Sequence, residues 1–494
     1  MKVGFDCDKY LKLQTKAFFK RAKMFNNKLY IEFGGKLFDD FHGSRVLPGF
    51  LPDIKIKVLE AIKDKLEIIF CVNAEDIEKN RIRGDSGLSY DLEVLRSVDA
   101  LRGFGLYVSS IVITLFSNQP SAVIFAKSLE NKNEKVYFHT YTKGYPSDVK
   151  TIVSEQGYGK NPYIKTTKPF VLVTAPGARS GKLATCLSQL YHEYKMGINA
   201  GYTKYETFPV WNLPLKHPIN LAYEAATADI KDTNMIDPYY LIATGKVAIN
   251  YNRDIETFPV LKEILSQITQ NQNFYNSPTN MGVNMAGFCI SDDKVCQESA
   301  KQEIIRRYYR YLTENKKGLI SYEVPERVKL LINELKIDLH DRKVIAPSFE
   351  KQKKTKTHCV AIELADGTIV TGKTQDIMTA TAGCILNSLK YLCNIKDNIT
   401  IIPAEILAPV LEFKQNILKL KNFALNLKDV LMALAISSAT SKNSKNALQK
   451  VQNLKGCELH STCILNQSDE FNLKNLGINL TCEPVFSGSD LFDF

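Results

Sequence analysis

Residues 169–195 read PFVLVTAPGARSGKLATCLSQLYHEYK and form the most informative stretch of the chain. The apolar run 170–173 predicts a buried strand, and an amphipathic helix is predicted to begin near Leu183. A loop of small residues between them ends in Gly181-Lys182. Glycine lets backbone N–H groups turn inward, a helix N-terminus adds partial positive charge, and lysine adds a full charge. The stretch therefore predicts a phosphate-binding or nucleotide-binding loop.

The loop matches the common phosphate-loop pattern, G-x-x-x-x-G-K-[ST], only in part. Pro176 occupies the place of the first glycine and Gly177 follows it, while Leu183 replaces the hydroxyl residue that normally reaches Mg²⁺. Ser180 and Thr185 are candidates to replace that hydroxyl. An ordinary strand-to-helix connection, in which Ser180 caps the helix, is the open alternative.

Length and composition bound the class of protein. A chain of 494 residues predicts two or three domains, and its 45% hydrophobic and 24% charged residues are typical of a globular protein. The 11 cysteines are scattered without a C-x-x-C pair, which favours buried thiols in a reducing compartment. No signal peptide opens the chain, and the apolar run 106–116 is too short to span a membrane. We expect a cytoplasmic protein without a membrane partner.

The net charge of +11 comes mostly from dispersed lysines. The single dense cluster, interpreted as a solvated loop, consists of Lys351, Lys353, Lys354 and Lys356. No aromatic-basic RNA motif accompanies it, so the pattern disfavours nucleic acid as a partner. Attraction for small anionic molecules suits the same charge.

Residues 1–200 predict an α/β domain with a mostly parallel sheet, because strands and helices alternate along it. The expected strands are 28–33, 66–72, 108–115, 136–139 and 170–174, with helices at 10–25, 54–64 and 92–101. Ligands in such sheets bind beyond the carboxyl ends of the strands. The loop after Thr174 and the weaker Gly34-Gly35-Lys36 loop should lie together at that edge.

Residues 201–335 predict a mostly helical subdomain, because strand signals fade there. The expected helices are 219–229, 258–269 and 298–315. Residues 336–494 predict an α+β C-terminal domain that starts where periodicity is lost, near 338–356. Its Asp366-Gly367 pair is a strong hairpin signal, since the turn needs positive φ. The other expected elements are helices 379–392, 427–438 and 445–454 and strands 359–364, 368–372, 459–465 and 478–484.

The polar segment 208–229 is a candidate for binding a second substrate. His217 precedes the expected helix, and Asn220 and Glu224 are one helical turn apart on it. Together with Lys182, we select His217 and Glu224 as candidate catalytic residues, the latter two as general acid or base. A helix cap on a hydrated surface explains the same residues equally well.

Two further polar clusters, 250–254 and 277–284, suit hydrogen bonding to a sugar or nucleotide, or plain turns. Glu75 or Asp76 is the best candidate for holding Mg²⁺ at a strand end. Cys457, His460 and Cys463 invite a zinc interpretation, but in a strand the histidine points away from both cysteines. We therefore assign no metal site.

The motifs resemble those of a bacterial family of about this length, known only as conserved proteins of unknown function. They are Glu32-Phe-Gly-Gly-Lys-Leu-Phe-Asp-Asp40, Thr174-Ala-Pro-Gly177, Ser180-Gly-Lys182, Asn212-Leu-Pro-Leu-Lys-His217 and Asp366-Gly-Thr-Ile-Val-Thr-Gly-Lys373. The resemblance covers essentially the whole chain. It implies a cytosolic bacterial protein with a multidomain α/β architecture and a phosphate-loop-like element, and it supplies no reaction.

The leading hypothesis is an enzyme that binds a nucleotide or another small phosphorylated ligand and transfers a phosphoryl or related group. Gly177, Ser180, Gly181, Lys182 and Thr185 would hold the ligand, with a nucleotide and Mg²⁺ as the candidate cofactor. The alternative is a non-catalytic ligand-binding or scaffold protein with a structural glycine loop. A dinucleotide-binding protein is a weaker third hypothesis, because G-x-G-x-x-G is absent. The sequence leaves the reaction, the substrate and a homo-oligomeric state open.

Overall fold

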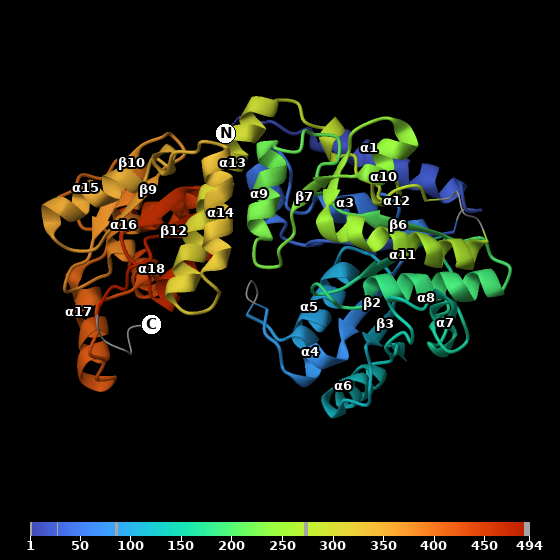
Figure 1. The fold of residues 1–494 in the computed structure, drawn as a ribbon. Coiled ribbons are helices and arrows are strands. Elements are labelled where there is room, and N and C mark those ends of the chain that lie inside the picture. Colours follow the sequence, from blue (N-terminus) through green and yellow to red (C-terminus); the bar gives the residue numbers. More distant parts are fainter. Residues whose placement is uncertain (1, 27, 84–86, 271–274, 489–494) are drawn as a thin grey trace. The chain divides into compact units, whose positions relative to one another are not determined.

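The computed structural model describes residues 2–26, 28–83, 87–270 and 275–488. They fall into two compact units, coloured mainly blue to green and yellow to red in Figure 1. The N-terminal unit consists of residues 2–224 and 232–300, and the C-terminal unit of residues 225–231 and the chain from Lys301 onward.

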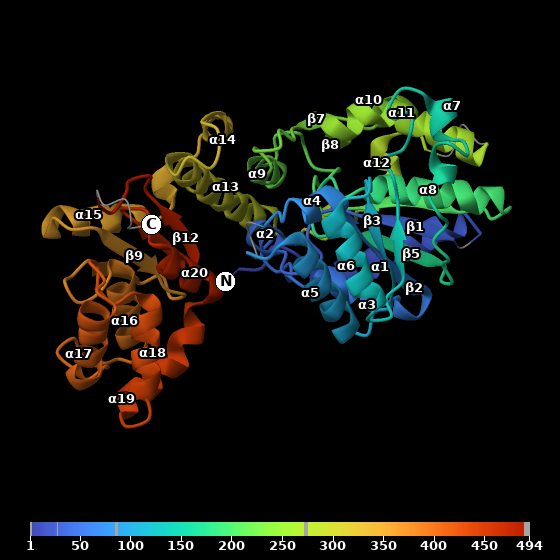
Figure 2. The same cartoon turned by 90° about the horizontal axis from the view of Figure 1, so that it is seen from below.

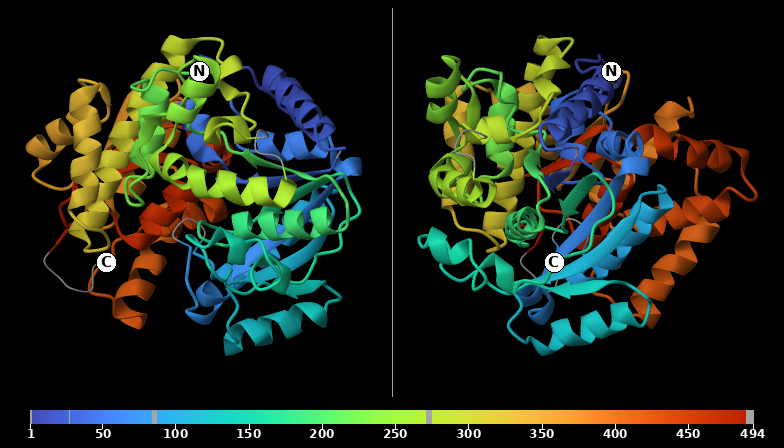
Figure 3. Two further views of the ribbon diagram at one scale, coloured as in Figure 1. Left: turned by 45° about the vertical axis from the view of Figure 1, so that its right-hand side comes forward. Right: turned by 90° about the vertical axis from the view of Figure 1, so that its right-hand side faces the viewer.

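A six-stranded parallel sheet organises the N-terminal unit. Its strands are β1 (Leu29–Phe33), β2 (Leu66–Asn73), β3 (Val108–Thr114), β4 (Val136–Phe138), β5 (Phe170–Thr174) and β6 (Gly201–Tyr205). Their order in the sheet is β4-β3-β2-β5-β1-β6, and every neighbouring pair is parallel. Figure 2 shows the central strands side by side, and Figure 3 shows the sheet from two further directions. The expected α/β fold with a mostly parallel sheet is confirmed.

Helices surround this sheet. They are α1 (Cys7–Lys23), α2 (Phe41–Val46), α3 (Ile54–Glu60), α4 (Ala74–Glu78), α5 (Tyr90–Gly103), α6 (Pro120–Glu130), α7 (Val149–Ile152), α8 (Lys182–Lys195), α9 (Pro218–Ala226), α10 (Pro238–Thr244), α11 (Asn252–Thr269) and α12 (Pro278–Met281). Strands β2, β3 and β5 are buried along their whole length. Most of their residues are apolar because helices cover both of their faces, and polar residues such as Ser109 and Ser110 are buried among them.

Side chains of a strand alternate between the two faces of the sheet. Phe33 and Tyr205 point to one face, where the Tyr205 ring lies 5.1 Å from that of Phe18 in α1. Tyr30 points to the other face, and its hydroxyl donates to Glu193 of α8 at 2.6 Å. Helix α1 therefore covers one face and α8 covers the opposite one.

The connections that follow the neighbouring strands β1 and β5 run toward opposite edges of the sheet. The chain leaves β1 toward β2 and crosses β5, whereas it leaves β5 toward β6 and crosses β1. Because such crossovers are right-handed, the two connections lie on opposite faces. The carboxyl ends of β1 and β5 thus form a topological switch point, which is where open α/β sheets bind ligands.

The expectation that strands fade after residue 200 is wrong in part. Strand β6 completes the parallel sheet, and β7 (Asn234–Ile236) pairs with β8 (Ile249–Tyr251) in an antiparallel ladder. These strands are short, and β6 lies at an edge of its sheet, so none needs a long apolar run.

The C-terminal unit is an α+β domain with a mixed sheet of order β10-β9-β11-β12. The expected hairpin is confirmed: β9 and β10 pair antiparallel around Gly367, whose φ is 86°. The elements are α13 (Asp293–Lys316), which begins before this unit, α14 (Glu323–Glu334), α15 (Ile345–Thr355), β9 (Cys359–Glu363), β10 (Ile369–Lys373), α16 (Ala380–Leu392), α17 (Ala404–Glu412), α18 (Leu427–Ser437), α19 (Lys442–Lys450), β11 (Glu458–Ser461), α20 (Gln467–Asn475) and β12 (Asn479–Cys482).

The sequence suggested that the lysine cluster at 351–356 is a loop, and this interpretation is wrong. Lys351, Lys353 and Lys354 lie in α15, and Lys356 follows its end with a φ of 59°. Ile345 and Ser348 are buried on one side of this helix. The helix therefore has a buried side despite its high charge.

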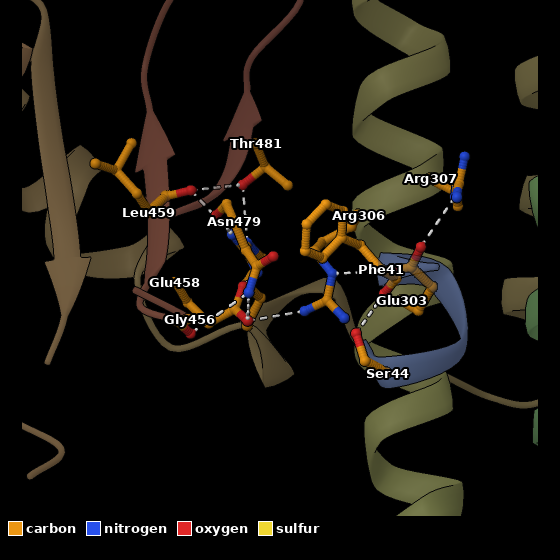
Figure 4. A network of polar contacts seen from close by, with 11 residues as sticks. Phe41, Ser44, Glu303, Arg306, Arg307, Gly456, Glu458, Leu459, Asn479 and Thr481 are labelled. Carbon is orange, nitrogen blue, oxygen red and sulfur yellow. Dashed lines mark hydrogen bonds and ion pairs between the residues drawn. The ribbon is translucent and has the colours of Figure 1, made fainter. Parts of the chain in front are cut away.

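Buried charges join α13 to the C-terminal sheet, as Figure 4 shows. Glu458 of β11 accepts a hydrogen bond from Arg306 of α13 at 2.9 Å and another from Arg342. The Arg342 side chain is only 1% exposed, and it also donates to Thr481 Oγ1 and to backbone carbonyl oxygens of β11 and β12. This network holds together segments that are more than 100 residues apart in the sequence.

Among the described helices, none is both long enough and apolar enough to cross a lipid bilayer.

Candidate functional site

The glycine loop of residues 175–181 connects the carboxyl end of β5 to the start of α8. Gly181 caps α8 with a φ of 77°, a conformation that L side chains rarely adopt. A Cβ atom at Gly177 would lie 2.7 Å from the Tyr90 hydroxyl, and one at Gly181 would lie 2.8 Å from Thr114. Both positions therefore require glycine for close packing, and Gly181 also for its backbone angle.

The loop carbonyl groups are bound by the protein itself. Thr114 donates to the Ser180 carbonyl oxygen at 2.8 Å, and Asn73 donates to that of Arg179 at 3.3 Å. The Ser180 hydroxyl donates to the Gly177 carbonyl oxygen at 3.0 Å. Hydrogen bonds to its carbonyl oxygens thus fix the conformation of the loop.

The loop amides contrast with its carbonyls. Within the described part of the chain, no backbone N–H group from 177 to 184 donates a hydrogen bond to a protein acceptor. Three of them belong to the first turn of α8, where N–H groups have no partner inside the helix. The others belong to the loop, whose backbone is constrained by the positive φ of Arg179 and Gly181. A run of free donors therefore surrounds the helix start.

Lys182 lies over the same loop. Its ammonium donates to the Gly177 carbonyl oxygen at 3.2 Å and to the Ser180 hydroxyl at 3.3 Å. Thr185 is completely buried, and its hydroxyl accepts from the Cys71 thiol of β2 at 3.5 Å. Gly177, Ser180, Gly181 and Lys182 are thus brought together, while Thr185 lies deeper in the core and its Mg²⁺ role stays a prediction.

A cluster of charged residues lies on the α8 side of β1 and β6. Lys204 is the register partner of Glu32, so both side chains point to this face. The Lys204 ammonium lies 2.6 Å from Asp254 of α11 and 3.3 Å from Glu206, the residue after β6. We call Glu32, Lys204, Glu206 and Asp254 the edge cluster.

Neighbouring residues shape the edge cluster. Tyr202 donates its hydroxyl hydrogen to the Glu32 carboxylate at 2.5 Å. A Cβ atom at Gly34 would lie 1.9 Å from the Glu206 carboxylate, so the glycine after β1 makes room for that group. The loop that begins at Gly34 therefore packs against the edge cluster.

Burial and like charge alter the acidity of the edge cluster. Burial raises the pKa of Glu206, Lys204 lowers it less, and Asp254 adds to the rise. Burial lowers the pKa of Lys204, but Asp254 and Glu206 outweigh it, so that pKa lies above its ordinary value. The lysine thus stays charged, and Glu206 holds a proton more readily than a free glutamate.

The edge cluster and the loop are close to each other. Glu32 is the register partner of Val173, which precedes the last residue of β5. Burial and then the Glu32 carboxylate raise the pKa of Cys186 on α8, whereas the Lys182 ammonium lowers it. Because Cys186 is one helical turn after Lys182, Glu32 lies beside the first turns of α8.

His217 and Glu224 make local contacts. The His217 ring lies 3.0 Å from the Asp293 carboxylate, and burial lowers its pKa more than Asp293 raises it. Glu224 accepts two hydrogen bonds from Asn234, both at 3.0 Å. The Asn220 side chain accepts a hydrogen bond from the Val210 N–H group and donates one to the Val210 carbonyl oxygen. Each of these side chains is thus bound to another residue of the same unit. The catalytic roles of His217 and Glu224 stay predictions.

The two polar clusters of the helical region are brought together. Asn250 donates to the Thr279 hydroxyl at 3.3 Å, and Thr279 donates to Asp237 at 2.7 Å. Asn284 donates to the backbone carbonyl oxygen of Thr207 at 2.8 Å. These groups stabilise turns. Asp254 belongs to the edge cluster, and the Val283 N–H of the second polar cluster donates to the Lys204 carbonyl oxygen at 2.9 Å.

Candidate metal ligands do not converge in the described residues, where no group of three histidine, cysteine, aspartate or glutamate residues is placed to hold an ion. Glu75 pairs with Lys79 at 2.5 Å, and Asp76 pairs with Arg81 at 3.2 Å. His460 is fully buried and bonded to Thr481 at 2.9 Å.

Sequence reasoning missed Lys204 and Glu206, and considered Glu32 only as part of a motif. One signal was available for Glu32, because it is the single charged residue in the apolar strand Leu29–Phe33. Lys204 near the end of β6 and Glu206 directly after the strand alternate with buried residues, which is ordinary for a sheet edge. Only their register beside Glu32 makes them notable.

Comparison with known proteins extends over both units. Residues 3–336 match the family model described as Domain of unknown function DUF1846, N-terminal, and residues 340–492 match its C-terminal counterpart. The chain is 52% identical over 500 residues to a UPF0371 protein of Clostridium botulinum (strain Alaska E43 / Type E3), covering 100% of this chain and 99% of the relative. A UPF0371 protein of Clostridium tetani (strain Massachusetts / E88) is 51% identical over 500 residues, with the same coverage of both chains.

Proposed function

This chain belongs to the UPF0371 family, a family of unknown function, and we propose that it binds a small phosphorylated ligand through the loop at 175–181. Gly177, Ser180 and Gly181 donate backbone N–H groups to the phosphate, and Lys182 neutralises its charge. We further propose that the protein is an enzyme of phosphoryl or related group transfer, with a nucleotide or another small phosphorylated compound as its ligand.

The observation that carries this proposal is the set of free amides from 177 to 184. A backbone N–H group without an acceptor must be exposed to water or bound to a ligand, because leaving it buried and unpaired costs about 1–3 kcal/mol. Several such donors at one helix start favour an anion with several oxygen atoms. Phosphate fits this requirement.

The place of the loop in the sheet supports the same proposal. The loop follows β5 at the switch point between β1 and β5, where neighbouring connections leave on opposite faces. Carboxylates and a lysine of the edge cluster flank it on β1 and β6. A phosphate group on the loop would thus leave the rest of the ligand beside ionisable side chains, as a group-transfer site requires.

Replacing Lys182 by alanine is expected to weaken binding of ATP or of a sugar phosphate about 10- to 150-fold, because a charge-assisted hydrogen bond contributes about 1.5–3 kcal/mol. Isothermal titration calorimetry with and without Mg²⁺ measures the change. A thermal-shift panel of nucleotides, dinucleotides and sugar phosphates selects the ligand first. The melting temperature of the free variant should stay near that of the wild type.

The matched control is Lys195→Ala at the other end of α8, where the ammonium pairs with exposed Glu155 at 3.2 Å. This variant should bind like the wild type. Equal affinities for wild type and Lys182→Ala would refute the role of Lys182. A wild type that binds no phosphorylated compound in a saturable manner would instead support the alternative, a scaffold protein with a structural glycine loop.

A further inference from the structure

Helix α17 is continued by a π-helical turn, Phe413–Ile417, and the two together are apolar on two sides. The inner side is partly buried against the core of the C-terminal unit and consists of Ile406, Leu407, Val410 and Leu411. The outer side carries Pro409, Phe413 and Ile417, which are exposed and follow one another at intervals of one helical turn. We call these three residues the outer stripe. A helix that is apolar on both sides is normally buried, yet none of the nine residues of α17 is buried.

The surroundings of the outer stripe are apolar as well. Phe413 and Ile417 are 51% and 68% exposed. Further large apolar side chains after the helix and on α18, against which α17 packs, are also exposed, namely Leu418, Leu420, Met432 and Ile436. Figures 1 and 2 show α17 at the periphery of the C-terminal unit. Single exposed apolar side chains are ordinary, whereas a group of them marks an interaction surface.

Charges of opposite sign lie at the two ends of the outer stripe. Glu405 precedes Pro409 by one turn, whereas Lys419 and Lys421 follow Ile417. All three charged side chains are exposed, and none of them forms an ion pair with a residue that the structure describes. Such a surface is complementary to a reversed copy of itself, because the acidic end of one helix then meets the basic end of the other. The charge pattern therefore favours a second copy of this chain as the partner.

We propose that the outer stripe is the contact of a homodimer, in which α17 of one copy packs antiparallel against α17 of a second copy across a two-fold axis. Phe413 is midway along the stripe, so the two Phe413 rings meet near the axis and Pro409 of each copy faces Ile417 of the other. Glu405 of each copy faces Lys419 and Lys421 of the other. A two-fold interface uses the same surface on both copies, so every contact occurs twice. This inference does not depend on the phosphate loop.

The first test measures the oligomeric state of the full-length protein by sedimentation velocity. A single pair of helices is smaller than a standard interface, so the concentration series should reach about 100 µM. Ile417→Asp should raise the dissociation constant of the dimer at least about 100-fold, because symmetry places the buried charge in the interface twice. The matched control is Leu330→Asp, since Leu330 of α14 is 67% exposed and lies in the same unit. This control should dimerise like the wild type, and circular dichroism should show both variants folded.

The second test reverses the charges at the ends of the stripe. The variant Glu405→Lys, and separately the double variant Lys419→Glu with Lys421→Glu, should each dimerise about 10-fold more weakly than the wild type, because like charges then meet at both ends. An equimolar mixture of these two proteins should associate with the strength of the wild type, since opposite charges again meet at both ends. Only a reversed pairing of two copies predicts this recovery.

Three outcomes would overturn the proposal. The first is a wild type that stays monomeric throughout the series, which would show that a lipid surface, another protein or another part of the chain covers the outer stripe. The second is an Ile417→Asp variant that dimerises as strongly as Leu330→Asp. The third is a mixture of the charge variants that associates no better than either component alone.

Discussion

Replacing Glu458 by alanine is expected to destabilise the C-terminal unit by about 3–5 kcal/mol, because it leaves buried positive charge without its counter-ion. Arg306 and Arg342 both donate to this carboxylate. Arg306 keeps a second partner in Glu303 at 2.8 Å, whereas Arg342 keeps only a hydroxyl and carbonyl oxygens. Most of the cost should therefore arise at Arg342, whose side chain is 1% exposed.

The measurement is urea unfolding followed by hydrogen-exchange mass spectrometry, which reports peptides of the two units separately. Peptides of β11, β12 and α13 should lose protection at lower urea in the variant. The matched control is Glu326→Ala, since Glu326 forms an exposed pair with Lys329 at 3.7 Å. Exposed pairs contribute about 0–1 kcal/mol, so this control should unfold like the wild type. A cost below 1 kcal/mol for Glu458→Ala would contradict the assigned role of the network.

The second large effect is expected at Lys55, where methionine should destabilise the N-terminal unit by about 3–5 kcal/mol. The Lys55 ammonium lies 2.8 Å from Asp40, and the two side chains are only 3% and 8% exposed. Asp40 also accepts from the backbone N–H of Gly43 at 3.0 Å and caps α2. Among the described residues, removing the lysine would leave that carboxylate buried with the Gly43 hydrogen bond and without its ammonium partner.

Lys57→Met is the control on the same helix, because Lys57 pairs with Asp53 at 3.8 Å and both side chains are about half exposed. It should change the free energy of unfolding by less than about 1 kcal/mol. The double variant Lys55→Met with Asp40→Asn should recover part of the loss, because no unpaired charge remains. Chemical denaturation monitored by circular dichroism measures all three variants, and equal stability of Lys55→Met and Lys57→Met would refute the prediction.

Acid titration gives a second measurement on the same pair. Burial raises the pKa of Asp40, but Lys55 and the hydrogen bonds outweigh burial, so the folded-state pKa lies below its ordinary value. A depressed carboxyl pKa contributes stability above the unfolded value of about 3.9 and loses it as pH falls toward the folded one. The wild type should therefore lose more stability than Lys55→Met does when the pH is lowered below about 4.

Most secondary elements were predictable from the sequence because their signals are local. The strands around Phe70 and Val112 are mostly apolar, and Asp366-Gly367 suits a turn with positive φ. The failures have local causes as well. At 351–356 the density of lysines hides the helical periodicity, so the helix was not predicted. Strand β6 contains Lys204, whose polar side chain suits an edge strand but weakens the apolar signal of the strand.

The candidate site divides in the same way. Gly177, Ser180, Gly181 and Lys182 were predicted together because they are neighbours in one loop and their chemistry depends on backbone conformation. The edge cluster was not predicted as a unit, since Glu32 and Asp254 are separated by more than 200 residues. His217 and Glu224 share a segment, but sequence alone does not show that their partners are Asp293 and Asn234.

By itself, the sequence determined that a parallel α/β sheet forms and that a glycine loop with a lysine follows one of its strands, because hydrophobic periodicity and glycine conformation act over a few residues. Only the tertiary structure decided that β5 lies between β2 and β1, and that the loop consequently opens beside Glu32 and Lys204. Strand order depends on contacts between distant segments and on the handedness of crossovers. The free amides were likewise decided by folding, since Thr114 and Asn73 from other strands bind the loop carbonyl groups and leave its N–H groups available.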